Sequence, residues 1–335
     1  MRVVVPVAGI GTRLRPLTDH VPKILLPVAG QPILGHILDS LIPVRPVEIV
    51  LVVGYRGDQV RDYVAEAFSG LPVRFVEQRE QRGLGHAVLQ ALDPVRDEES
   101  LLVLLGDTIF DVDYAALAAR DADLLGVRRV EDPRRFGIAV VDAGRITRLV
   151  EKPEQPVGDL ALVGIYRFRR AGPLRSALLA LLDRGITTRG EVQLTDGLQL
   201  MLEEGVGFEP FEVEGWFDCG TPDILLETNR VLLERAAGRA RGAVADGPPG
   251  ARIVQPVHIG ARVDLTAATL GPHVAIGDGS RILRSTLRDA IVGRGAEIRD
   301  AHVEHAVVGD GARVNGGTVT GLVAPASPQQ PQEST

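Results

Sequence analysis

Apolar residues in the first third of the chain follow two alternating patterns. Strand-sized apolar segments lie at residues 3–7, 48–53, 73–76 and 101–105. Between them, apolar side chains recur every three or four residues, as on one face of a helix, at 33–42, 58–68 and 84–92. This alternation predicts an α/β fold in which helices cover a sheet. Residues 101–105 are apolar on both strand faces, which predicts a strand in the middle of a mostly parallel sheet.

The next part of the chain alternates less regularly. Its pattern predicts a turn at 142–144, strands at 124–130, 137–141, 146–150 and 160–168, and helices at 173–182 and 191–202. A further helix begins with Thr221 as N-cap and Pro222 at the first helical position, and it runs to about Arg235. We therefore expect residues 1–235 to form a Rossmann-like α/β domain around a mixed sheet.

A repeat dominates the C-terminal part of the chain. The segments Ile276–Ile282, Val292–Ile298 and Val308–Val314 share an aliphatic-Gly-x-Gly-x-x-aliphatic pattern with a period of 16 residues. This pattern resembles the left-handed β-helix of hexapeptide-repeat proteins, whose stacked coils bury aliphatic side chains. We expect a short left-handed β-helix at 253–323, preceded by a linker at 236–252 and followed by a disordered tail at 324–335.

Composition excludes several classes of function. The chain of 335 residues contains one cysteine, Cys219, so neither an intrachain disulfide nor a zinc site of several cysteines can form. We expect this thiol to be buried and inert. A formal net charge of −7 argues against nucleic acid as a partner. No apolar run is long enough to span a membrane, so we expect a cytoplasmic protein without a membrane partner.

The loop after the first strand is suited to phosphate. Gly9 and Gly11 allow a ligand to approach the backbone closely, and the cations Arg13, Arg15 and Lys23 follow. The loop is not a dinucleotide fingerprint, because a leucine stands where the third glycine would be. It is not a P-loop either, because it has no Gly-Lys-Ser/Thr.

The segment from Gly9 to Thr18, followed by Pro22-Lys23, resembles the N-terminal signature of the sugar-1-phosphate nucleotidylyltransferases. The resemblance extends over residues 1–235. It implies that Arg13 and Lys23 bind the triphosphate and act in catalysis, and that the nucleotide also contacts Ala8, Gly9, Gly11 and Thr12. It further implies that Asp107 and Asp218 bind Mg²⁺, a cation that is held by a few carboxylates together with substrate phosphates.

The same resemblance assigns residues to the base and to the sugar. Gln78 and Gly83 lie in the segment that reads a uracil or thymine base, where we expect His86 to be a surface residue of a helix. Lys152 is implied to contact the sugar phosphate as a catalytic residue. The residues implied to line the sugar site are Gly137, Glu151, Val163, Arg189 and Glu191. For Arg189, a role in capping the following helix remains an equal alternative.

These residues predict Mg²⁺-dependent transfer of a nucleotidyl group from UTP or dTTP to glucose 1-phosphate. The products are UDP-glucose or dTDP-glucose and pyrophosphate. The two bases differ by one methyl group, so motifs alone do not decide between the two donors. One alternative is a mannose-1-phosphate guanylyltransferase or another nucleotide-sugar pyrophosphorylase. Another is a non-catalytic regulatory subunit that binds a nucleotide sugar.

The role of the β-helix stays open at this point. Relatives that carry one include long thymidylyltransferases, guanylyltransferases and bifunctional enzymes with an acyltransferase site. An acyltransferase needs a histidine between coils and more coils than this segment holds, so we favour regulation or oligomerisation. We expect a homo-oligomer, assembled through the β-helix or the catalytic domain.

Overall fold

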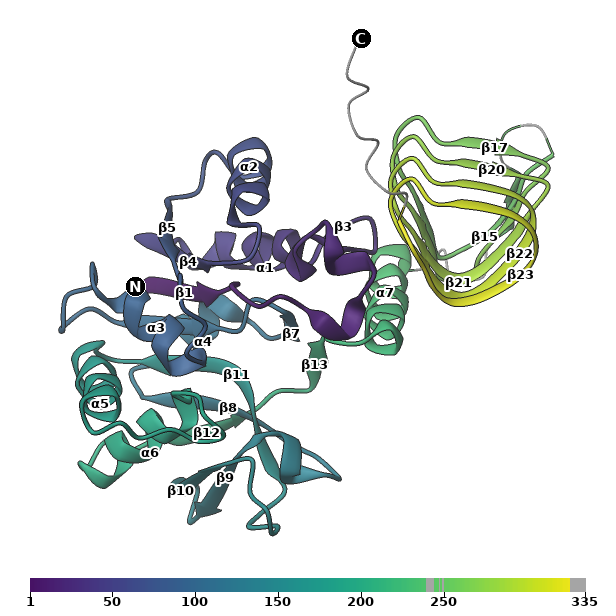
Figure 1. Cartoon of the computed structure of the whole chain (residues 1–335). Helices are drawn as coiled ribbons and strands as arrows, with labels where there is room; N and C mark the ends of the chain where they lie inside the picture. Colours follow the sequence, from purple (N-terminus) through teal and green to yellow (C-terminus); the bar gives the residue numbers. More distant parts are fainter. Residues whose placement is uncertain (239–243, 247, 249, 326–335) are drawn as a thin grey trace. The chain divides into compact units, whose positions relative to one another are not determined.

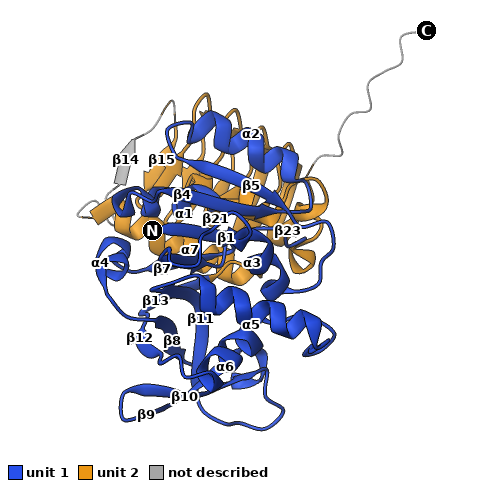
Figure 2. Ribbon diagram, turned by 90° about the vertical axis from the view of Figure 1, so that its left-hand side faces the viewer, with its two compact units in different colours: residues 1–10, 34–217 blue, residues 11–33, 218–335 orange. Residues whose placement is uncertain are grey.

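The computed structural model describes residues 1–238, 244–246, 248 and 250–325 (Figure 1). These residues form two compact units. The first comprises Met1–Ile10 and Leu34–Phe217, and the second comprises Gly11–Ile33 and the described residues from Asp218 onward (Figure 2).

A mixed sheet forms the centre of the first unit (Figure 1). Its strands follow the order β10-β9-β11-β6-β1-β4-β5, with β8 beside β11 and β12 beside β8. Their bounds are β1 Arg2–Pro6, β4 Glu48–Val53, β5 Val73–Glu77, β6 Leu101–Leu104, β8 Leu124–Arg129, β9 Gly137–Asp142, β10 Arg145–Glu151, β11 Leu160–Phe168 and β12 Glu209–Glu212. Strands β5, β4, β1 and β6 run parallel, whereas β11 runs antiparallel to β6. The predicted mixed α/β sheet is confirmed.

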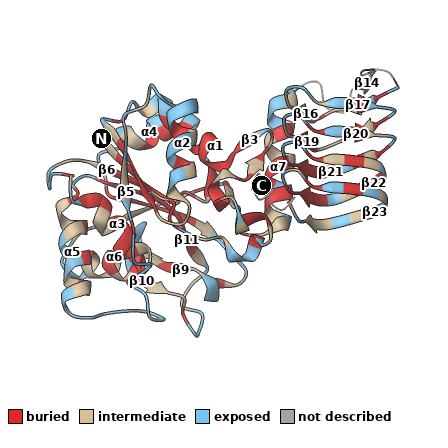
Figure 3. Cartoon of the chain, turned by 45° about the horizontal axis from the view of Figure 1, so that its top comes forward, coloured by how far each residue is buried: buried red, intermediate tan, exposed pale blue. Residues whose placement is uncertain are grey.

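The core of this unit lies on both faces of β6. Leu101, Leu102 and Val103 are fully buried and Leu104 is 1% exposed, as expected for a strand that is apolar on both faces (Figure 3). The helices of the unit are α1 Ile33–Leu41, α2 Gly57–Ala67, α3 Leu84–Leu92, α4 Tyr114–Ala119, α5 Gly172–Asp183 and α6 Leu194–Glu203. Apolar side chains of α3, α5 and α6 share one buried cluster with the sheet.

One predicted helix begins later than expected. We predicted a helix from residue 191, but α6 begins at Leu194. The backbone N–H groups of Thr188 and Glu191 each donate to the other residue's carbonyl, at 3.0 and 3.2 Å. Arg189 and Gly190 between them have left-handed φ angles of 54° and 81°. This tight turn is incompatible with a right-handed helix, so the helix starts after it.

Short elements were missed by the pattern analysis. Strand β7 (Thr108–Asp111) pairs with β13 (Gly215–Asp218). Helix α4 begins at Tyr114 and is capped by Asp113, whose carboxylate accepts from the Ala116 N–H at 2.9 Å. These elements, like β12, contain too few residues for a periodic pattern to stand out.

The second unit contains α7 (Pro222–Ala237) and a curled, parallel sheet that has the architecture of a short left-handed β-helix (Figure 1). As predicted, Thr221 caps α7, with its hydroxyl accepting from the Ile224 N–H at 3.5 Å. The strands of the coils are β15 Arg252–Val254, β16 Val257–Ile259, β17 Asp264–Thr266, β18 Thr269–Leu270, β19 Val274–Ile276, β20 Arg281–Leu283, β21 Thr286–Val292, β22 Glu297–Val308 and β23 Arg313–Val323.

The sixteen-residue repeat is the register of this sheet. Parallel pairing aligns Ile282 with Ile298 and Val314, and it aligns Leu287 with Val303 and Val319. Most of these aliphatic side chains are buried in one core along the axis of the coils. The earliest coil is less regular, as expected, because Val257 pairs with Val274, one residue beyond the repeat.

Each coil turns at residues with left-handed φ angles. The corners form three columns, which are Arg262, Gly279, Gly295 and Gly311; Ala267, Arg284, Asp300 and Gly316; and His273, Asp289 and His305. Glycine adopts this conformation without steric cost, whereas other residues do so under strain.

The predicted linker and tail are only partly within the described residues. In the range 236–252, α7 continues to Ala237, β14 (Val244–Asp246) pairs with β15, and β15 begins at Arg252. Residues 239–243, 247 and 249 lie outside the described residues, as do residues 326–335 of the tail.

Candidate active site

The glycine-containing loop after β1 depends on Gly11. Its φ angle is 73°, and a Cβ at this position would lie 2.8 Å from the Cβ of Lys23. Both the backbone angle and the space therefore require glycine. The Thr18 hydroxyl donates to the Gly11 carbonyl at 2.9 Å, and the 3-10 turns Thr12–Leu14 and Lys23–Leu25 flank this contact. The loop thus holds Thr12 and Arg13 beside the turn that carries Lys23.

Two cations and a carboxylate meet in the second unit. Lys23 is only 6% exposed, and its Nζ lies 3.6 Å from Oδ1 of Asp218. Arg13 reaches the same place, because a Cβ at Gly220 would lie 2.5 Å from Nη2 of Arg13 and 3.0 Å from Oδ1 of Asp218. A buried ammonium needs a nearby anion. With two cations and one carboxylate, this cluster can bind a further polyanion such as a triphosphate.

Asp107 lies at the carboxyl end of β6, where the polar end of a central strand faces the ligand crevice of an α/β sheet. Gly106 packs directly on β1, since a Cβ there would lie 2.3 Å from Val7 and 2.7 Å from the Pro6 carbonyl. Asp107 is half-buried and accepts from the Thr108 hydroxyl at 3.3 Å. The same edge carries Ala8, which is buried, and the exposed Gly9.

Gln78 and Gly83 contact each other at the end of β5. The Gln78 side chain is only 6% exposed, and its Nε2 donates to the Gly83 carbonyl at 3.2 Å. Gly83 has a φ angle of 107°, and a Cβ there would lie 2.6 Å from the Val192 carbonyl, so only glycine fits. The two residues of the predicted base-reading segment therefore lie together, and their role in reading a base stays a prediction.

His86 is not the surface residue that we expected. It is 8% exposed on the inner side of α3, and its ring nitrogens lie 3.2 Å from Nε2 of Gln78 and 3.3 Å from Nε2 of Gln90. Burial lowers the pKa of His86, which favours the neutral ring. The helical pattern misled us because α3 is buried on more than one side. His86 therefore supports the side chain of Gln78.

The predicted sugar residues gather around the start of β9. Gly137 pairs with Glu151, and a Cβ at Gly137 would lie 3.1 Å from Oε2 of Glu151. The Glu151 side chain is 8% exposed, and its Oε1 lies 3.1 Å from Nζ of Lys152. Nη2 of Arg189 donates to the Lys152 carbonyl at 3.4 Å. Arg189 does not cap α6, because that helix begins beyond it.

Contacts within the first unit join the base segment to the sugar segment. A Cβ at Gly83 would lie 2.9 Å from the Cβ of Glu191, whose Oε2 accepts from Nε2 of Gln193 at 3.0 Å. Val163 is 1% exposed, so the structure buries this predicted sugar-site residue. The neighbouring Gly164 packs on Leu105, two residues before Asp107.

Two further residues belong to this sugar-side group. A Cβ at Gly137 would lie 2.5 Å from the Thr195 hydroxyl, and Asp196 accepts from the Thr188 hydroxyl at 2.7 Å. Burial is the main cause that raises the pKa of Asp196, with a smaller contribution from the charge of Glu151. In the sequence, Thr195 and Asp196 belong to the motif that follows Glu191, and this motif is the signal that could have identified them as site residues.

The described residues supply no complete metal site, since no three of their His, Cys, Asp and Glu side chains group together. The candidates for binding Mg²⁺ remain Asp107 and Asp218, whose segments are distant in the sequence. Cys219 is buried as predicted, and its sulfur lies 3.7 Å from the Thr228 hydroxyl. No helix in the described part of the chain combines the length and apolarity needed to cross a membrane.

Comparisons with known proteins place the chain among related enzymes. The chain is 34% identical to the UTP–glucose-1-phosphate uridylyltransferase AglF of Haloferax volcanii over 70% of this chain and 97% of that protein. It is 32% identical to a glucose-1-phosphate thymidylyltransferase of Streptomyces griseus over 89% of this chain and 88% of the relative.

A solved structure shares the fold. A UDP-glucose pyrophosphorylase complexed with UDP-glucose superposes with a TM-score of 0.60 at 21% identity, over 70% of this chain and 98% of that one. The family model described as nucleotidyl transferase matches residues 2–235. The chain therefore belongs to the nucleotidyl transferase family.

Proposed function

We propose that this enzyme transfers a nucleotidyl group from UTP or dTTP to glucose 1-phosphate, in a reaction that depends on Mg²⁺. The observation that carries the proposal is the cluster of Arg13, Lys23 and Asp218. Its buried lysine and neighbouring guanidinium match what a triphosphate and a departing pyrophosphate require.

The reaction needs positioning and neutralisation of charge rather than covalent catalysis. A phosphate oxygen of the sugar phosphate attacks the α-phosphorus of the nucleotide, and the bond from that phosphorus to the β-phosphate oxygen breaks. Arg13 and Lys23 neutralise the charge that collects on the pyrophosphate as it leaves. Lys152, paired with Glu151, orients the attacking phosphate.

Asp107 and Asp218 are the residues that would hold the cation. Mg²⁺ accepts one or two carboxylates and takes its other ligands from phosphates and water, so a set of two aspartates fits it. When bound, Mg²⁺ supplies positive charge at the α-phosphoryl group. Nζ of Lys23 lies 3.6 Å from Oδ1 of Asp218, so one of these two carboxylates also contacts a cation of the proposed triphosphate site.

The pyrimidine preference rests on Gln78. Its Nε2 is committed to the Gly83 carbonyl, which leaves Oε1 as the atom that can accept from the imide N–H of uracil or thymine. Cytosine lacks that N–H, and a purine presents a different edge. The relatives named for UTP and for dTTP are similar to this chain at nearly the same identity, so both donors stay in the proposal.

The test is a panel of UTP, dTTP, CTP, GTP and ATP, each supplied with glucose 1-phosphate and Mg²⁺. Pyrophosphate and the nucleotide sugar are both quantified, and an EDTA arm tests the metal. We expect equal amounts of the two products from UTP or dTTP, and none with EDTA. A purine preference would overturn the base assignment in favour of a guanylyltransferase or a related enzyme. Nucleotide-sugar binding without turnover would support the non-catalytic alternative.

A further inference from the structure

The cations of the proposed triphosphate site belong to the same compact unit as the β-helix. Residues 11–33, which include Arg13 and Lys23, fall in the unit that contains α7 and the coils, and strand β2 (Pro27–Val28) contacts α7. Contacts from α7 and from the coils hold residues 11–33 in place.

One corner column of the β-helix holds α7. His273 contacts Glu234 at 3.0 Å, Asp289 contacts Arg230 at 2.9 Å and His305 contacts Asp223 at 3.2 Å. The three α7 residues are spaced seven and four positions apart, so they lie on one face of the helix. His305 also contacts Asp289 at 2.8 Å, which links two successive coils.

The corner residues of this column are strained. His273, Asp289 and His305 have φ angles of 64°, 46° and 48°, where glycine would fit without cost. In the column of Arg262, Gly279, Gly295 and Gly311, three of the four corners are glycines. The side chains of His273, Asp289 and His305 are the ones that contact α7, so the strained corners of this column coincide with its ion pairs to the helix.

A buried amide connects α7 to the segment that carries the cations. Asn229 is fully buried, and its Oδ1 accepts from the Ala29 N–H at 2.9 Å while its Nδ2 donates to the His273 carbonyl at 3.2 Å. The ring of His258 covers the next residue, because a Cβ at Gly30 would lie 2.4 Å from it. The hairpin of β2 (Pro27–Val28) and β3 (Gln31–Pro32) is thereby held from two sides.

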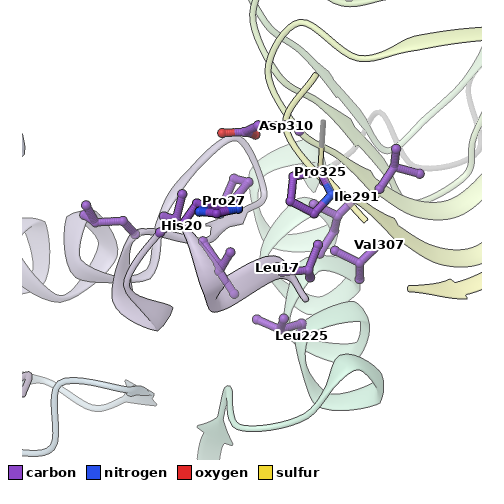
Figure 4. Close-up of a pocket in the computed structure, with 14 residues that line it drawn as sticks. Leu17, His20, Pro27, Leu225, Ile291, Val307, Asp310 and Pro325 are labelled. Carbon is purple, nitrogen blue, oxygen red and sulfur yellow. The ribbon is translucent and has the colours of Figure 1, made fainter. Parts of the chain in front are cut away.

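Apolar packing completes this contact but leaves a cavity. Ile291 and Val307 are paired neighbours on successive coils. Both are buried, although the residues on either side of them are the ones that belong to the core of the coils. Together with Leu17, Leu25 and Leu225 they line a cavity of about 230 Å³ (Figure 4). Because the apolar packing there is incomplete, we attribute the position of residues 11–33 against α7 to the hydrogen bonds of Asn229, and the position of α7 to those of the corner residues.

We propose that the β-helix of this protein positions the triphosphate-binding segment, with His273, Asp289 and His305 holding α7 and with Asn229 and His258 holding residues 29–30. The β-helix thus acts on the proposed reaction through Lys23. This residue lies four positions before the hairpin that α7 and His258 hold, and it packs against Gly11 of the loop. The expected effect on KM rests on the proposed function. The expected effect on the order of residues 11–33 does not.

The test uses the full-length protein and two readouts. Hydrogen exchange of the amides in residues 11–33 reports the order of the segment, and KM for UTP or dTTP against kcat reports the site. Asn229→Leu removes both amide hydrogen bonds. Asp289→Gly removes the corner side chain while relieving its strain. Asp300→Gly is the matched control, because Asp300 is a strained corner of the same coils whose side chain contacts Arg284 instead of α7.

We expect Asn229→Leu and Asp289→Gly to speed exchange across residues 11–33 at least about ten-fold, equal to about 1.4 kcal/mol of local opening free energy. KM for the nucleotide should rise by a similar factor, with kcat changing less. Asp300→Gly should change neither. Unchanged exchange in folded Asn229→Leu or Asp289→Gly would overturn the inference. Faster exchange in a protein that turns over no nucleotide would uphold the positioning role and reject the proposed function. If Asn229→Leu does not fold, Asp289→Gly decides.

Discussion

Single residues in this protein are defined as much by what packs on them as by their own chemistry. Gly11 is needed because the Cβ of Lys23 lies against it, and the guanidinium of Arg13 lies against Gly220. Lys23 is the clearest case, since an ammonium that is 6% exposed has no structural reason to be buried except its anionic partners.

We predict that Lys23→Met lowers kcat for pyrophosphate release about 100-fold or more, because it removes a preorganised positive charge at the leaving group. Steady-state kinetics with saturating UTP or dTTP provide the measurement. Arg313→Met is the matched control, because Arg313 lies on a coil of the β-helix, is 77% exposed and contacts Glu297 at 3.9 Å. A control that loses as much activity as Lys23→Met would contradict the assignment.

A second prediction at this scale concerns His86. His86→Leu leaves Nε2 of Gln78 with one acceptor fewer, so the amide loses its fixed orientation. We expect kcat/KM for UTP or dTTP to fall about ten-fold, a loss of about 1.4 kcal/mol of transition-state stabilisation. His86→Gln, which keeps a polar amide at that position, should restore most of the loss. Equal values for wild type and His86→Leu would show that His86 only fills space.

At the scale of elements, α7 connects the phosphate-binding segment to the β-helix. Leu225 on α7 is fully buried and lines the cavity beside Ile291 and Val307. We predict that Leu225→Ala destabilises the protein by about 2–5 kcal/mol, because it enlarges an existing cavity. Thermal or urea unfolding measures the change. Leu179→Ala, at a position 44% exposed, should cost far less, and comparable losses would contradict this account of the packing.

The contacts of α7 should also depend on pH through His305. Hydrogen bonds to Asp289 and then Asp223 raise the pKa of His305 above its ordinary value of 6.5. A raised pKa in the folded state stabilises the protein fully below the unfolded-state pKa, and the contribution disappears as pH rises through the folded-state value. Arg230 and Glu234 on α7 and His273 on the neighbouring corner are the other charged or titratable groups of this contact.

We therefore expect His305→Gln to lower the melting temperature relative to wild type at pH 5.5 and to leave it unchanged at pH 9. The difference should correspond to no more than about 1 kcal/mol, because the side chain is half-exposed and water screens the ion pairs. The result that would contradict this account is a destabilisation that is the same at both pH values.

These elements also show what could be predicted from the sequence. Long periodic segments such as α3, α5 and β11 were predicted within one residue or two, because their apolar faces repeat over enough positions. The sixteen-residue repeat predicted the register of the coils. The pattern could not reveal β7, α4 or the tight turn at Arg189, since each depends on local backbone angles and partners distant in the chain.

At the scale of the whole molecule, the compact units follow packing, whereas our predicted ranges followed composition. Residues 11–33 are close in sequence to β1, yet they pack with α7 and the coils in the second unit. No local pattern predicts this, because the contacts of Ala29 and Gly30 are with Asn229 and His258. The motifs named residues that lie side by side in the structure, such as Arg13 and Asp218 or Gln78 and Gly83, and their chemical roles stay predictions.

The central claim is that these residues together perform nucleotidyl transfer to a sugar phosphate. Its most direct test is the initial rate of pyrophosphate release from UTP and from dTTP, measured with and without glucose 1-phosphate in the presence of Mg²⁺. We predict release with at least one of the two nucleotides that requires the sugar phosphate and is matched mole for mole by a nucleotide sugar. Release that is independent of glucose 1-phosphate, or no release from either nucleotide, would contradict the account.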